Sequence, residues 1–107
     1  MPIYNKLVRD KIPNIIESTG KKFTTSILSD DEFIKELKKK SFEELEEYMA
    51  TETNEEAKEE LADLLEIIHA LAKYHGSSIE EIELIRKEKA DKRGEFQEKI
   101  FLVEVED

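Results

Sequence analysis

Residues 29–66, which read SDDEFIKELKKKSFEELEEYMATETNEEAKEELADLLE, decide the fold of this chain. They open with Ser29-Asp-Asp-Glu32, which has the form of a capping box. In such a box the serine hydroxyl accepts from the backbone N–H of the glutamate, and the glutamate carboxylate accepts from the backbone N–H of the serine. Thr53-x-x-Glu56 offers a second box. Apolar residues follow each box at helical spacing. The stretch therefore predicts two long helices, over about 30–50 and 54–75, whose short connection makes them antiparallel neighbours.

The flanking sequence adds shorter elements. Pro13 suits the first turn of a short helix that runs to about Ser18. Ser78-x-x-Glu81 is a third capping box, and it opens a helix that ends near Arg93 and is closed by Gly94. Only three Gly and two Pro interrupt the chain. We therefore expect a single, mainly all-α domain over residues 1–107, built as an antiparallel bundle of three main helices.

Two further segments favour strands. Residues 22–28 are rich in β-forming side chains, and residues 99–105 alternate loosely between apolar and polar. They could pair as a small two-stranded sheet at the side of the bundle.

The net charge of this chain is concentrated in one block. The formal charge is -10, and residues 41–66 alone sum to -10, against +3 for residues 1–40 and -3 for residues 67–107. Such an acidic chain repels phosphate backbones, so we expect no nucleic-acid partner. The absence of cysteine excludes disulfides and thiolate chemistry. No apolar run approaches a membrane span and no signal peptide is evident, so we expect no membrane partner and a cytoplasmic location.

Two acids of this block fall on apolar faces when the helices are drawn at 100° per residue. Glu44 lies within the apolar arc of the first long helix and Glu60 within that of the second. Glu47 and Asp63 follow each of them by three residues, at the edge of the arc. The two pairs could face each other across one groove, or they could be rim residues paired with Lys38, Lys40 or Lys73.

Four carboxylates in one groove require a cation, because like charges at short distance cannot all stay ionised. Carboxylate oxygens are hard ligands, which select Mg²⁺, or Mn²⁺ in its place, over soft metals. The sequence therefore predicts a divalent metal site formed by Glu44, Glu47, Glu60 and Asp63.

The same residues carry a family resemblance. Glu44-x-x-Glu47 followed by Glu60-x-x-Asp63 resembles the metal-binding signature of the MazG-like, all-α nucleoside triphosphate pyrophosphohydrolases. Residues 4–13, YNKLVRDKIP, resemble the opening of a small single-domain subgroup, often labelled phosphoribosyl-ATP pyrophosphohydrolase-like. Lys89-x-x-x-Arg93-Gly-x-Phe96 resembles the C-terminal signature of that subgroup.

The resemblance implies an enzyme that uses Mg²⁺ to hydrolyse a nucleoside triphosphate, or a related nucleotide, to the monophosphate and pyrophosphate, as in nucleotide-pool housekeeping. It implies a homodimer or homotetramer, and Glu44 or Glu47 could act as general base as well as metal ligand. The phosphoribosyl-ATP pyrophosphohydrolase of histidine biosynthesis is the alternative substrate assignment. Two other functions stay open: an acidic helical module that binds a basic partner, and a regulator that binds a nucleotide without cleaving it.

Basic residues are the candidates for phosphate contact. Lys89 and Arg93 share one face of the last helix, where cations could also simply offset the helix dipole, and the resemblance favours substrate binding. Lys6 and Arg9 could contact phosphate, contact a neighbouring subunit, or be solvated surface.

Overall fold

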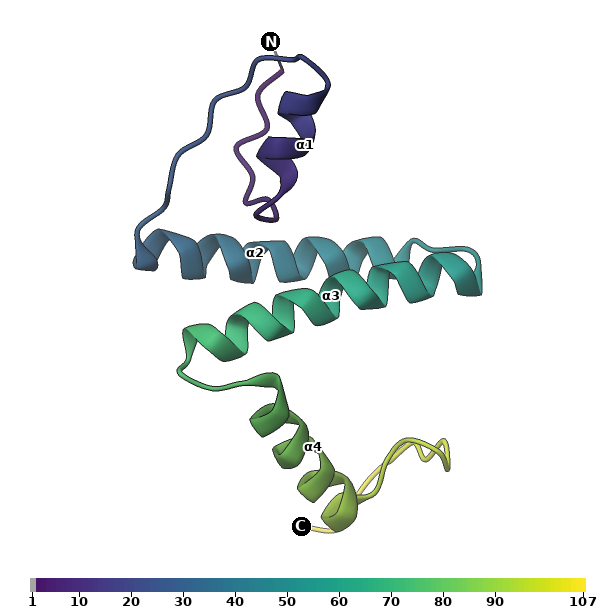
Figure 1. Ribbon diagram of the computed structural model, residues 1–107. Coiled ribbons are helices and arrows are strands. Elements are labelled where there is room, and N and C mark those ends of the chain that lie inside the picture. The colour runs from purple at the N-terminus through teal and green to yellow at the C-terminus, as the bar shows by residue number, and fades with distance from the viewer. Residues whose placement is uncertain (1) are drawn as a thin grey trace.

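The computed structural model describes residues 2–107 and contains four helices over that range. They are α1 (Ile12–Ser18), α2 (Asp30–Met49), α3 (Asn54–Tyr74) and α4 (Ile79–Arg93). Helices α2 and α3 form an antiparallel hairpin, and α4 packs on α3 (Figure 1). The predicted all-α bundle of three main helices is confirmed, and each predicted helix is within one residue or two of its observed bounds.

The helix starts follow from the three capping residues. Ser29, Thr53 and Ser78 each accept a hydrogen bond from the backbone N–H three residues on. Only Ser29 forms the complete box, because the Glu32 carboxylate also accepts from the Ser29 N–H. At the other two starts the glutamate turns to a preceding residue: Glu56 accepts from the Glu52 N–H, and Glu81 from the Ser77 hydroxyl. The reciprocal half of the two later boxes was therefore predicted wrongly.

Gly76 ends α3 in a Schellman motif. Its φ is +74°, a left-handed conformation that glycine adopts without strain. The Ser77 N–H donates to the Ala72 carbonyl at 2.8 Å, and the Gly76 N–H donates to the Lys73 carbonyl at 3.0 Å. This motif stops α3 and lets the chain turn into α4.

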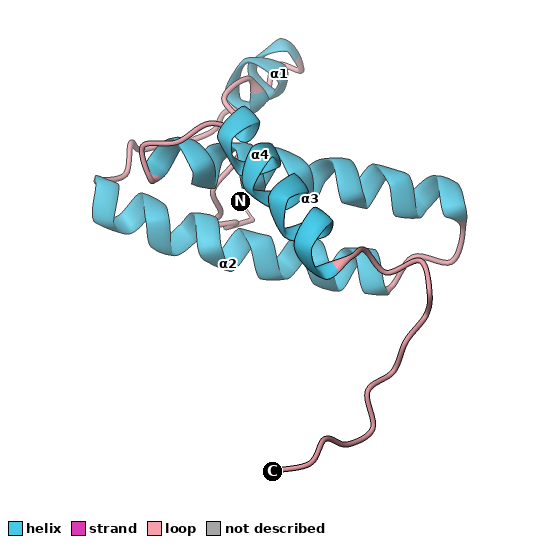
Figure 2. Ribbon diagram, turned by 90° about the horizontal axis from the view of Figure 1, so that it is seen from below, coloured by secondary structure: helices cyan, strands magenta, loops and turns pink. Residues whose placement is uncertain are grey.

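The predicted two-stranded sheet is absent from residues 2–107. Residues 22–28 and 99–105 contain no strand, and both run as irregular chain (Figure 2). The first lies between α1 and α2 and the second follows α4, so the two segments leave opposite ends of the molecule (Figure 1). The β-forming composition was recognised correctly, but the topology of one chain does not bring the segments side by side.

The core of the single chain is thin. Leu37, Ile67 and Ala72 are its buried apolar residues in the described part of the chain. A tilted contact of Phe33 with Tyr74, whose ring centroids lie 6.4 Å apart, joins the start of α2 to the end of α3. Helical spacing places four further apolar residues on the core face, yet they expose between 45% and 75% of their surface: Leu45, Met49, Leu61 and Leu65. The expectation that they lie inside a core is wrong for the isolated chain. The two helices of a hairpin cover only the faces that they turn toward each other.

None of the helices within residues 2–107 is both long enough and apolar enough to cross a membrane.

Candidate metal centre

The α2–α3 hairpin brings three carboxylates together. Glu44 and Glu47 lie one turn apart on α2, and Glu60 faces them from α3. One oxygen from each of the three lies within 4.8 Å of the others. The residue spacing on α2 explains the geometry, since positions three apart share a helix face. Three of the four predicted ligands thus form one cluster.

Burial distinguishes Glu44 from the other acids in the described part of the chain. Glu44 is only 8% exposed, as predicted from its place in the apolar arc, and Glu60 is half-buried. Oε2 of Glu44 and Oε2 of Glu60 are buried without a hydrogen-bond partner. A buried carboxylate oxygen without a hydrogen-bond partner costs about 1–3 kcal/mol of stability, and more when it is charged. The arrangement is therefore one that a bound cation would stabilise.

The pKa values of two of these acids also reflect the cost of burying their charges. Burial, and next the negative charge of Glu47, raise the pKa of Glu44 from 4.5 to about 7. Burial also raises the pKa of Glu60, with Glu47 and Asp63 adding to the shift. Both effects disfavour the ionised form, as expected when acids meet in a site shielded from water. Such shifts are typical of functional sites, although structural clusters also produce them.

One lysine partly offsets the charge. The Nζ atom of Lys40 lies 3.9 Å from Oε1 of Glu44, one helical turn earlier on α2. This distance is too long for a hydrogen bond, so Lys40 acts through its charge, which lowers the pKa of Glu44 against the larger effect of burial. The pairing was among the alternatives that the sequence left open, and it leaves the other oxygen of Glu44 without a partner.

Asp63, the fourth predicted ligand, is engaged by Arg9. The guanidinium Nη2 donates to Oδ1 of Asp63 at 2.7 Å, which ties the N-terminal segment to α3. Both side chains are about half exposed. Each residue had a predicted role, but their pairing was not predicted, because 54 positions separate them and no local pattern links residues so far apart.

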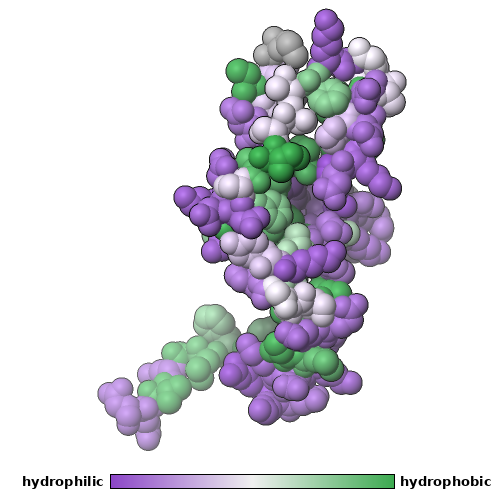
Figure 3. All heavy atoms as spheres, turned by 60° about the vertical axis from the view of Figure 1, so that its left-hand side comes forward, coloured by the Kyte–Doolittle hydropathy of each residue, from purple (hydrophilic) through white to green (hydrophobic). Residues whose placement is uncertain are grey.

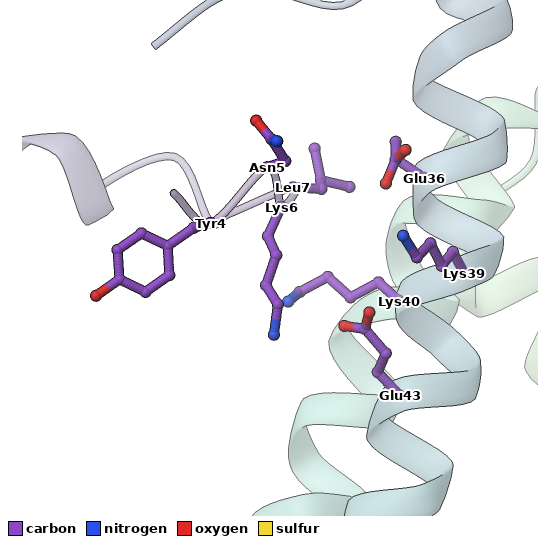
Figure 4. Close-up of a pocket in the computed structure, with 8 residues that line it drawn as sticks. All are labelled: Tyr4, Asn5, Lys6, Leu7, Glu36, Lys39, Lys40 and Glu43. Atoms are coloured by element: carbon purple, nitrogen blue, oxygen red, sulfur yellow. The ribbon is translucent and has the colours of Figure 1, made fainter. Parts of the chain in front are cut away.

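Lys6 lies beside α2 in a hollow that none of the three clustered acids lines. With Lys39 and Lys40 it lines a small hollow of about 60 Å³ between the N-terminal segment and α2. The side chains of Lys6 and Lys40 converge there, with Glu36 and Glu43 beside them (Figure 4). Lys39 and the participation of Lys40 in this hollow were missed. The signal that could have found them is the run of three lysines that ends four residues before Glu44.

Lys89 and Arg93 lie on α4 and are exposed. Within residues 2–107 neither side chain forms an ion pair or hydrogen bond with the acidic cluster. The structure therefore does not join these two predicted phosphate contacts to the site. Arg93 does sit in the last turn of its helix, where a cation offsets the dipole.

The donor set fits a hard divalent cation. Two oxygens on opposite sides of one Mg²⁺ are about 4.2 Å apart, twice an Mg–O distance of about 2.1 Å. The carboxylates of Glu44, Glu47 and Glu60 are already almost this close, so small side-chain rotations would bring them onto one ion. Chemically, the cluster can hold such an ion with coordination positions left over for water or another ligand.

Comparisons with known proteins assign no family: no family model, no curated protein and no solved structure matches the chain. What the chain's own residues define is an all-α protein whose central hairpin carries a cluster of three acids.

Proposed function

We propose that this protein is a Mg²⁺-dependent nucleotide pyrophosphohydrolase, which converts a nucleoside triphosphate or a related nucleotide to the monophosphate and pyrophosphate. The observation that carries the proposal is the unpartnered, buried Oε2 of Glu44 beside Glu47 and Glu60. An interaction surface would turn its acids to solvent, whereas Glu44 points inward. The resemblance of four ordered segments to the MazG-like enzymes supports the same activity.

Glu44, Glu47 and Glu60 would hold the metal, and Mn²⁺ could replace Mg²⁺ because both prefer carboxylate oxygens. When bound, the ion supplies charge neutralisation for the phosphates and lowers the pKa of a coordinated water. Asp63 lies beside this set, and it would join it once Arg9 exchanges its carboxylate partner for a substrate phosphate. Phosphate oxygens offer the guanidinium the same paired acceptors as a carboxylate.

The proton of the attacking water needs an acceptor, and the choice lies between Glu44 and Glu47. Both would hold the metal, but Glu44 is buried whereas Glu47 is exposed, so an oxygen of Glu47 can also reach a water molecule. Glu47 is therefore the better general base in this proposal. Little covalent chemistry is asked of the protein, since positioning and charge stabilisation dominate phosphoryl transfer.

The cations around the cluster would receive the phosphates. Lys6 and Lys40 share the hollow beside α2. Arg9 forms an ion pair with Asp63, the fourth predicted ligand. No glycine-rich loop precedes a helix in this chain, so backbone amides offer no phosphate cradle of that kind. Lys89 and Arg93 stay predictions as substrate contacts.

The test is pyrophosphate release from a panel of nucleoside triphosphates and phosphoribosyl-ATP, with Mg²⁺ or Mn²⁺ and with excess chelator. We expect turnover of at least one member that chelator abolishes. Glu60→Gln should lower the rate by at least 10²-fold, roughly the scale for a lost electrostatic stabiliser. Glu59→Gln is the matched control, because Glu59 is the exposed neighbour on α3 and should retain full activity.

Two results would overturn the proposal. If no nucleotide is hydrolysed with either metal, the protein is not this enzyme, and nucleotide binding without turnover would identify a regulator instead. If Glu60→Gln keeps full activity, the acidic cluster is not the active site.

A further inference from the structure

The C-terminal tail, defined here as residues 99–107, is apolar and uncovered. It follows α4 and extends away from the helices, and its hydrophobic side chains line the protruding segment (Figure 3). Five of them expose between 73% and 88% of their surface: Ile100, Phe101, Leu102, Val103 and Val105. Exposed apolar runs of this kind mark contact sites in soluble proteins.

A second segment has the same character at the other end of the molecule. Residues 21–28, here the basic segment, run between α1 and α2 without strand partners in the described chain. Ile27 is 98% exposed, although Phe23 is more than half covered. The segment carries Lys21 and Lys22, whereas the tail carries one base, Lys99, and three acids, Glu104, Glu106 and Asp107. Two extended, oppositely charged segments therefore leave opposite ends of one chain (Figure 1).

One antiparallel register brings apolar residues opposite apolar residues and lysines opposite acids. It places Thr25 opposite Val103. Each step forward along the basic segment is then matched by one step backward along the tail. One face of the ribbon then carries Phe23 with Val105 and Ile27 with Phe101. The same face carries Lys21 opposite Asp107 at its end. The other face carries Lys22 opposite Glu106 at one end and Leu28 opposite Ile100 at the other. Directly opposed side chains of this kind stabilise antiparallel pairs, and opposite charges are favourable there.

The other uncovered site on the molecule fits the tail less well. An open groove of about 590 Å³ between α3 and α4 is lined by Leu65, His69, Ile79 and Leu84, but also by Glu80 and Glu83. Glu83 is already paired with Arg86, but Glu80 would meet the acids of the tail. Charge therefore directs the tail to the basic segment and away from this groove.

We infer that the tail of one chain pairs as an antiparallel β-strand with the basic segment of a second copy of the same chain. By two-fold symmetry the exchange is reciprocal, so that a dimer contains two such ribbons. An isolated two-stranded ribbon is marginal in water, and its apolar face needs a covering surface, which the dimer supplies. The inference does not depend on nucleotide hydrolysis.

Disulfide trapping tests the inference directly, because the natural chain has no cysteine. Thr25→Cys protein and Val103→Cys protein are mixed, equilibrated and oxidised, and the products are separated without reductant. Thr24→Cys with Glu104→Cys is run in parallel, since adjacent pairs of a ladder alternate in Cα separation, about 5.5 Å and about 4.5 Å, and the two mixtures test both separations. We expect a cross-linked species of twice the chain mass in at least one mixture, and not from any variant alone.

Matched controls distinguish pairing from collision. Glu98→Cys lies on the same chain end as Val103 but five positions out of register, about 17 Å along a strand. Its mixture with Thr25→Cys should cross-link at least tenfold less. Equal cross-linking of the two mixtures, or none in either ladder pair, would overturn the inference. A double variant Thr25→Cys, Val103→Cys that is oxidised within a single chain, at monomer mass, would also overturn it.

Discussion

At the scale of single residues, the most informative side chain is Glu44, an acid that lies within the apolar face of its helix. Glu44 could be found from the sequence because it lies seven positions after Leu37 and four before Tyr48. By helical geometry this is a position on the core face. Its buried state in the structure agrees. The contact of Arg9 with Asp63 could not be found this way, because a pair 54 positions apart depends on how the N-terminal segment folds back over the hairpin.

The raised pKa of Glu44 predicts a pH-dependent stability. The folded state keeps this proton up to about pH 7, whereas the unfolded chain releases it near 4.5, so the folded state loses stability as pH rises between these values. Glu44→Gln removes the effect. Without metal, the variant should be more stable than the natural protein by about 1–3 kcal/mol at pH 8, at roughly 1.36 kcal/mol for each unit of pKa. The difference should vanish near pH 4.

Urea unfolding at both pH values, in the presence of chelator, measures this difference. Glu46→Gln is the control, because Glu46 is exposed on the same helix and should give no pH-dependent gain. Addition of Mg²⁺ at pH 8 should stabilise the natural protein and not Glu44→Gln. An equal gain for Glu44→Gln at both pH values would show that burial of its charge is not the cause.

At the scale of elements, helix starts were predictable and strand pairing was not. A cap depends on residues three positions apart, so Ser29, Thr53 and Ser78 could be read directly from the sequence. The final direction of Glu56 and Glu81 could not, because each chooses between two neighbouring donors only a residue apart. The sheet over 22–28 and 99–105 required knowledge of topology, which local composition does not contain.

The complete box at Ser29 should make it the most sensitive of these positions. Ser29→Ala removes the acceptor for the Glu32 N–H and should destabilise the protein by about 1 kcal/mol. Ser41→Ala provides the contrast, because Ser41 lies inside α2 and alanine is the better helix former there. We expect Ser41→Ala to be neutral or slightly stabilising. Thermal unfolding of the two variants checks the prediction, and equal losses for both would contradict it.

At the scale of the whole molecule, we propose that a second chain covers the thin core and the exposed leucines. Leu61 and Leu65 have the spacing of a core face on α3 but are about half exposed, as is Leu45 on α2. Burying a leucine fully is worth about 1.5–3 kcal/mol. Two hairpins placed face to face would form a four-helix bundle and recover part of this energy. Binary patterning thus predicts which residues need covering, but not whether the same chain covers them.

The last prediction follows from that account. Light scattering should give about 25 kDa, twice the chain mass of 12.5 kDa, or a tetramer at twice that value. Because association stabilises only the folded state, the Tm should rise with protein concentration. Leu65→Gln should weaken the association and lower the Tm, whereas Glu66→Gln, at the exposed next position, should not. A mass of 12.5 kDa, with a Tm that does not change over a hundredfold dilution, would mean that the leucines face water in a stable monomer.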